Sequence, residues 1–197
     1  MKQRSYHPEK KRTTRLILPL FITFIMIASA FGIIFSGYSS PPDGQDRSLL
    51  TIDGVQFSSL PSGRWKALFR DGRTLELQFG PRDLPPLSLD LVPLHAAQKV
   101  YLSASQDDYY NALPDLRNAL LPSVSVFFAC YEDVPGCENF PLKDCGDAGN
   151  GVVVIRLKAS EQDSATLEQG CYLLQGSPVY LNKVADALAL AYSGVHL

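Results

Sequence analysis

The feature that most constrains this chain is an uncharged apolar run from Leu16 to Gly37, bounded by Arg15 on one side and followed by Asp43 as the next charge. At roughly 1.5 Å per residue, a helix over this run would be about 33 Å long, enough to cross a hydrocarbon layer about 30 Å thick. A water-facing helix would carry a polar stripe, and this run has none. The sequence therefore predicts a transmembrane helix at 16–37.

Signal-peptide cleavage is the alternative, because Ala28-Ser29-Ala30 has the small-x-small form that a signal peptidase recognises. The apolar run, however, continues beyond this site to Phe35, whereas a cleavable signal turns polar near its cut. We therefore favour a retained signal-anchor over cleavage after Ala30.

The residues that flank the span predict its orientation. Lys and Arg flanks stay in the cytoplasm, which places the amino terminus inside and residues 38–197 outside the cytoplasmic membrane. The tail has one acidic residue, Glu9, and six basic residues: Lys2, Arg4, Lys10, Lys11, Arg12 and Arg15. The whole chain has 18 basic and 20 acidic residues, so 12 and 19 remain outside the tail, a formal charge of −7.

The acidic outer part disfavours nucleic acid as a partner, since phosphate binding needs clustered Lys and Arg. We expect contact with the lipid bilayer through residues 16–37, and a protein partner at the membrane or cell surface. Ala28, Gly32 and Ser36 recur at intervals of four on one helix face, where small residues allow close helix packing. Two alternatives follow: the helix self-associates through this face, or it contacts lipid alone.

Composition and turn signals divide the chain into five parts. They predict a basic cytoplasmic tail (1–15), the transmembrane helix (16–37), a Pro/Gly/Ser linker (38–48), a small β-meander with a proline-rich bridge (49–95), and a disulfide-stabilised α+β domain (96–197). The predicted fold class is therefore α+β.

The meander is predicted from strand patterns around Asp-Gly turns. We expect one strand near Leu50–Phe57 and a hairpin between Trp65–Phe69 and Thr74–Phe79. Trp65, the only tryptophan, is interpreted as a core anchor rather than as a ligand platform. The prolines of the bridge exclude a helix there and favour extended chain: Pro81, Pro85, Pro86 and Pro93.

The carboxyl-terminal domain is predicted to have the order β-α-β-β-β-α, with strands near 99–103, 124–130, 152–158 and 171–175 and a first helix near 107–121. This order resembles the core of the thioredoxin-like fold, in which a parallel strand-helix-strand unit precedes an antiparallel hairpin and a final helix. The turn "SASQDDYY" lacks the Cys-x-x-Cys of that family, so redox activity is not implied. A ferredoxin-like or unclassified α+β domain is also open.

The final helix has the clearest signals. Ser177 can cap it, Pro178 fits its first position, and Gly194 before Val195 predicts a left-handed stop. One face is apolar: Leu181, Val184, Ala185, Leu188 and Ala191.

The four cysteines all follow the span and, with the predicted topology, face an oxidising space. An even number there favours two disulfides. The sequence allows three pairings, and we favour Cys130–Cys137 with Cys145–Cys171. Zinc is disfavoured because no Cys-x2–4-Cys pair occurs, and reactive thiols because carboxylates crowd the first three cysteines.

No catalytic or cofactor motif is found, and the acidic cysteine loop lacks the calcium-binding spacing. His95 is the one imidazole in the body of the outer part, and a lone histidine is more often a surface or core residue. Tyr109 and Tyr110, beside Asp107 and Asp108, could line a cleft but are interpreted as packing residues. Neither a cofactor nor a metal is predicted, and an enzyme is disfavoured.

Several stretches together resemble small uncharacterised single-pass, membrane-anchored exodomain proteins of archaea: "DGVQFSSLPSGRWKALF", "ACYED", "CYLLQG" and "ADALALAYSGV". That resemblance implies no activity. The sequence favours an extracytoplasmic binding or accessory module. The alternatives are an exported thioredoxin-like thiol-disulfide protein and an enzyme of another kind, such as a hydrolase, whose site the sequence does not reveal. A pocket that joins His95 to a carboxylate and a hydroxyl would favour the latter.

Overall fold

A computed structural model of the protein describes residues 49–104, 112–121 and 123–197. These residues form a four-stranded antiparallel sheet and a five-stranded mixed sheet, which confirms the predicted α+β class. Within these ranges no helix is both long and apolar enough to cross a bilayer. The predicted span at 16–37, with Ala28, Gly32 and Ser36, lies outside the described residues and stays a prediction.

The smaller sheet is the predicted meander, with strands in chain order: β1 (Leu50–Ile52), β2 (Val55–Ser59), β3 (Trp65–Leu68) and β4 (Thr74–Leu77). The prediction of one strand near Leu50–Phe57 is wrong, because the chain reverses inside it. Asp53 and Gly54 have φ angles of 50° and 78°, the left-handed conformation of a tight hairpin turn. Leu50 therefore pairs with Phe57 across that hairpin.

The larger sheet has the strand order β6-β5-β7-β9-β8. Its strands are β5 (Lys99–Ser103), β6 (Ser125–Ala129), β7 (Val152–Ala159), β8 (Ser164–Glu168) and β9 (Cys171–Gly176). Helix α3 (Ala112–Leu120) connects β5 to its parallel neighbour β6.

The pairing predicted by the thioredoxin-like order is wrong at one point. β7 and β9 are parallel, not an antiparallel hairpin. The reason is β8, a strand absent from the predicted order, which makes the observed order β-α-β-β-β-β-α. Gln169 and Gly170, with φ angles of 47° and 87°, form the tight turn from β8 into its antiparallel partner β9.

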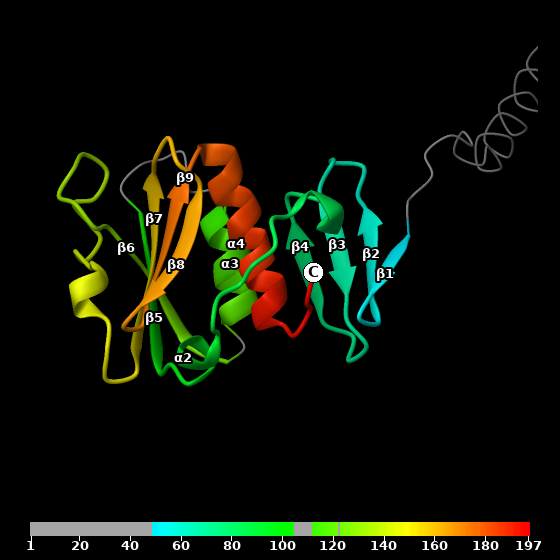
Figure 1. The fold of residues 1–197 in the computed structure, drawn as a ribbon, viewed down its shortest axis with the longest axis horizontal. Coiled ribbons are helices and arrows are strands. Elements are labelled where there is room, and N and C mark those ends of the chain that lie inside the picture. Colours follow the sequence, from blue (N-terminus) through cyan, green and yellow to red (C-terminus); the bar gives the residue numbers. More distant parts are fainter. Residues whose placement is uncertain (1–48, 105–111, 122) are drawn as a thin grey trace, which may run out of the picture. The chain divides into compact units, whose positions relative to one another are not determined.

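Helices α3 and α4 (Pro178–Tyr192) lie between the two sheets (Figure 1). Residues from both sheets and both helices form one buried core. The sequence predicted one apolar face on α4. The structure buries most of its circumference, since a helix between two layers must be apolar on both sides.

Both predicted ends of α4 are confirmed. The Ser177 hydroxyl accepts a hydrogen bond from the backbone N–H of Tyr180. At the other end Gly194 has a φ of 86° and its N–H donates to the carbonyl of Ala191, while Val195 N–H donates to Leu190. These two bonds form a Schellman motif, and the buried Val195 supplies its hydrophobic contact.

The proline-rich bridge contains two short helices, so the expectation that prolines exclude helix here is wrong. They are the 3₁₀ turn η1 (Pro81–Asp83) and α2 (Val92–His95). Each has a proline in its first turn, where a missing N–H costs no hydrogen bond. The hydroxyl of buried Tyr172 donates to the carbonyl of Asp90 at 2.7 Å and ties the bridge to the core. Burial raises the pKa of Tyr172 to about 12.

Candidate functional site

The two predicted disulfides are present and join Cys130 to Cys137 and Cys145 to Cys171, the pairing favoured from the sequence. They close the long connection from β6 to β7 and fasten it to β9. Cys130, Cys137 and Cys171 are buried and Cys145 is half-buried. The bonds therefore hold a loop in place on a sheet face.

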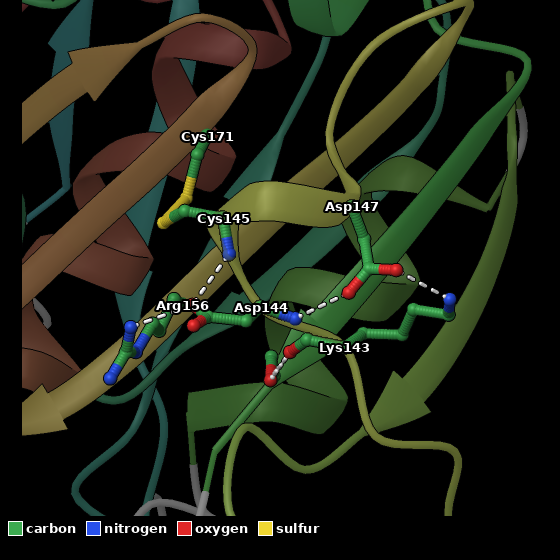
Figure 2. A network of polar contacts seen from close by, with 7 residues as sticks. Lys143, Asp144, Cys145, Asp147, Arg156 and Cys171 are labelled. Atoms are coloured by element: carbon green, nitrogen blue, oxygen red, sulfur yellow. Dashed lines mark hydrogen bonds and ion pairs between the residues drawn. A yellow bond between two sulfur atoms is a disulfide. The ribbon is translucent and has the colours of Figure 1, made fainter.

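That loop contains a polar network at the short turn η3 (Cys145–Asp147) (Figure 2). Lys143 Nζ lies 2.8 Å from Asp147 Oδ1, and Arg156 Nη1 lies 2.6 Å from Asp144 Oδ1. The hydrogen bond from Lys143 lowers the pKa of Asp147, and the same bond raises that of Lys143. The Asp144 side chain also accepts the N–H of Cys145. These carboxylates are thus engaged with cations and backbone N–H groups.

The described residues contain no group of three His, Cys, Asp or Glu side chains placed to hold a metal ion. All five carboxylates of the acidic cysteine loop are exposed: Glu132, Asp133, Glu138, Asp144 and Asp147. These carboxylates are therefore interpreted as surface charges of the loop that face solvent or pair with cations.

One lysine of the loop and three side chains of the sheet form what we call the lysine–aromatic face: Lys143, Lys99, Tyr101 and Phe127. The Tyr101 and Phe127 ring centroids are 5.9 Å apart. Lys99 Nζ lies 5.5 Å from the Phe127 centroid and 5.9 Å from that of Tyr101, and Lys143 Nζ lies 5.6 Å from Tyr101. Cation–π contacts at exposed sites contribute about 0.5–1 kcal/mol each, so they favour these positions of the ammonium groups.

The parallel register explains why these residues share one face. Tyr101 pairs with Phe127 and Leu102 with Phe128, so alternate positions of β5 and β6 face opposite ways. Val100 and Leu102 belong to the core beneath the helices. Consequently Tyr101 and Phe127 lie on the face turned away from α3 and α4, and Phe127 remains 47% exposed.

A second polar cluster is buried between the smaller sheet and the helices. Asp186 of α4 is 1% exposed, and its Oδ2 accepts hydrogen bonds from the backbone N–H groups of Gln78 (2.8 Å) and Phe79 (3.0 Å). On α3, Oδ1 of the buried Asp115 accepts a bond of 2.7 Å from Arg64 Nη2. Asp186 Oδ1 and Asp115 Oδ2 have no hydrogen-bond partner among the described residues.

Burial raises the pKa of Asp186 to about 7, and the charge of Asp115 acts in the same direction. The two backbone N–H groups and Arg64 oppose that rise. The hydrogen bond that Arg64 donates to Asp115 is the main reason that the pKa of Arg64 is raised. The Arg64 guanidinium thus pairs with Asp115 and acts on Asp186 only through its charge. The cluster links the smaller sheet to α3 and α4. We therefore interpret it as a structural contact, which we call the joint, in which the protonation of Asp186 depends on pH.

The remaining sequence candidates do not come together. His95 is exposed and stacks on the Tyr192 ring at 4.7 Å. Trp65 packs against the core and closely over the backbone of Gly80, in agreement with its interpretation as an anchor. Tyr109 and Tyr110 lie outside the described residues.

Neither the lysine–aromatic face nor the pair of buried carboxylates is predicted from the sequence. Asp186 had a usable signal, because it is the one charge within the apolar stretch "VADALAL". The alternating patterns of "KVYLS" and "SVFFA" indicated outward residues, but not that two strands distant in sequence would place them side by side.

No protein family, no curated protein and no solved structure matches this chain.

Proposed function

We propose that the protein is a binding or accessory module presented outside the cytoplasmic membrane, anchored by residues 16–37. The observation that carries the proposal is the lysine–aromatic face, where two ammonium groups and an exposed ring lie on the face of the larger sheet that is turned away from α3 and α4 (Figure 1). Aromatic side chains supply much of the binding energy at protein interfaces, and complementary charges supply specificity. The two disulfides support an oxidising compartment.

The disulfide-held loop gives this face rigidity. The Ser103 hydroxyl donates to the carbonyl of Lys143 at 2.6 Å, which fixes the backbone of one cation of the face. Arg156 lies 4.1 Å from the Tyr131 ring centroid and also pairs with Asp144. A surface that is ordered before binding loses less conformational entropy when a partner docks.

The test is recovery of crosslinked partners from native membranes with the full-length protein. Combining Lys99→Ala with Phe127→Ala removes an ammonium group and the exposed ring from the face, and recovery should be lost. A matched control combines Lys66→Ala with Leu68→Ala, a lysine and an exposed apolar residue on β3. Recovery unchanged by the first pair would overturn the proposed binding face.

Topology is tested separately by adding protease to intact cells. The proposal expects cleavage of the 38–197 part from outside. Protection of that part in cells whose surface proteins are digested would contradict the extracytoplasmic placement.

The alternative is an exported thiol-disulfide protein, and it would act through Cys145, the one cysteine that is not buried. Incubation of the native protein with glutathione, followed by mass spectrometry, tests this idea. A mixed disulfide at Cys145 would favour the alternative, and its absence would eliminate exchange chemistry.

A further inference from the structure

Strand β6 forms one edge of the larger sheet, and its only ladder in the described structure is with β5. Its sequence, "SVFFA", has no charge and no proline. Exposed edges are usually protected from pairing by charged residues, proline or very short strands. The other edge of this sheet, β8, contains Glu168, the edge strand β4 contains Glu76, and β1 spans only 3 residues. β6 is thus the least protected of these edges.

The free side of β6 is already used just past its end by the chain itself. The N–H of Cys130 donates to the carbonyl of Pro141 (3.0 Å), and Lys143 N–H donates to the carbonyl of Cys130 (2.7 Å). The carbonyl of the preceding Ala129 instead points to β5, where it accepts from Ala104. Successive residues of a strand direct their backbone groups to opposite sides. Val126 and Phe128 therefore direct theirs to the same free side as Cys130.

A cation lies over a ring on each face of this edge. Lys99 lies over Phe127 on the lysine–aromatic face, and Arg117 of α3 lies 5.4 Å from the Phe128 centroid on the helix-covered face. Neither cation is in an ion pair within the described part of the chain. A strand added to β6 would place alternate side chains toward these two cations.

Charge decides between two kinds of strand that could be added. In a second copy paired through its own β6, Lys99 and Arg117 would face the same cations of the other copy, and like charges across a pair are destabilising. A strand with carboxylates on both faces would meet complementary charge.

We propose that β6 binds an extended, acidic segment of a partner protein by strand addition, with backbone hydrogen bonds to Val126 and Phe128 and carboxylates near Lys99 and Arg117. This inference rests on the proposed binding function and names the chemistry of the partner. Backbone pairing would give affinity, and the two cations would give selectivity.

The probe is a short synthetic peptide that repeats Val-Val-Glu-Glu, so that neighbouring glutamates point to opposite faces of the added strand. Its binding is measured against the full-length protein in detergent. Matched peptides replace glutamate with lysine, or carry N-methyl groups along the edge that would pair. Binding of the glutamate peptide alone is expected. Lys99→Ala and Arg117→Ala should each raise the Kd about fivefold, the size of a single peripheral charge contact, whereas the control Lys66→Ala should leave it unchanged.

Three outcomes would overturn the inference: equal binding of the lysine peptide, equal binding of the N-methylated peptide, or crosslinked dimers joined through β6. Partner recovery that still depends on Lys99 and Phe127 would then show that the binding function stands without strand addition. If partner recovery also ceased to depend on Lys99 and Phe127, both strand addition and the proposed binding function would be contradicted.

Discussion

Asp186 in α4 accepts a hydrogen bond of 2.8 Å from the backbone N–H of Gln78, just beyond the end of β4. The two residues are 108 positions apart in the chain, so this bond fastens the smaller sheet to the helix layer. The same carboxylate accepts the N–H of Phe79 and is almost completely buried. The joint therefore depends on a charge that is costly to bury.

The joint should make stability depend on pH. The pKa of Asp186 is about 7 in the folded protein, above the ordinary value of about 4 expected when unfolded. Between these values the folded state holds a proton that the unfolded state has released. The free energy of unfolding should therefore fall as pH rises from about 4 to about 7, by up to about 4 kcal/mol. Asp186→Asn should remove this fall, as urea unfolding at several pH values would measure.

The matched control is Asp163→Asn, since Oδ1 of Asp163 also accepts a backbone N–H, that of Ser177, but at an exposed site. This variant should keep the wild-type dependence on pH. An unchanged slope in Asp186→Asn would show that another group is responsible.

Replacing Arg64 should lower the free energy of unfolding through its effect on the two buried carboxylates, Asp115 and Asp186. Arg64→Ala leaves Asp115 buried without its cation and removes positive charge near Asp186. Because Arg64 is partly exposed, we expect a loss of about 1–3 kcal/mol in the free energy of unfolding, less than for a fully buried pair. Adding Asp115→Asn should recover part of that loss, because the unpaired charge is then removed. A double variant less stable than Arg64→Ala would contradict this account.

The contribution of the end of α4 to stability can be tested by substituting Gly194. Its φ of 86° is unfavourable for residues with a Cβ, so Gly194→Ala should lower the free energy of unfolding by about 1 kcal/mol. Gly146 also has open space around it but does not have a positive φ, so Gly146→Ala is the matched control. Thermal unfolding would compare the two. Equal effects would mean that backbone conformation at Gly194 is not the cause.

The two disulfides should differ in their contribution. Cys145–Cys171 spans 26 residues and Cys130–Cys137 spans 7. Loop entropy then predicts that replacing the first pair with serine costs about 1 kcal/mol more than replacing the second. Urea unfolding of the two paired variants measures the difference. A larger cost for the shorter loop would show that local packing outweighs chain entropy.

Local signals in the sequence were sufficient for features that depend on a few neighbouring residues. The hairpin at Asp71-Gly72, the Ser177 cap and the Gly194 stop follow from backbone conformations that these residue types favour. The strand β8 escaped prediction because "SATLE" has a weak apolar pattern, and its pairing with β9 supplies what its own sequence lacks. Missing β8 reversed the predicted direction of β9 relative to β7.

The sequence by itself determined the α+β class, the ends of α4 and the presence of two disulfides. Tertiary structure alone decided that α4 lies between two sheets, that Asp186 caps the end of β4, and that Lys99 of β5 lies over Phe127 of β6. The physical reason is the separation along the chain of the residues that interact. Turns and caps are settled by the backbone preferences of adjacent residues, whereas a shared face or a buried charge depends on which distant segments pack together, and that depends on the free energy of the whole core.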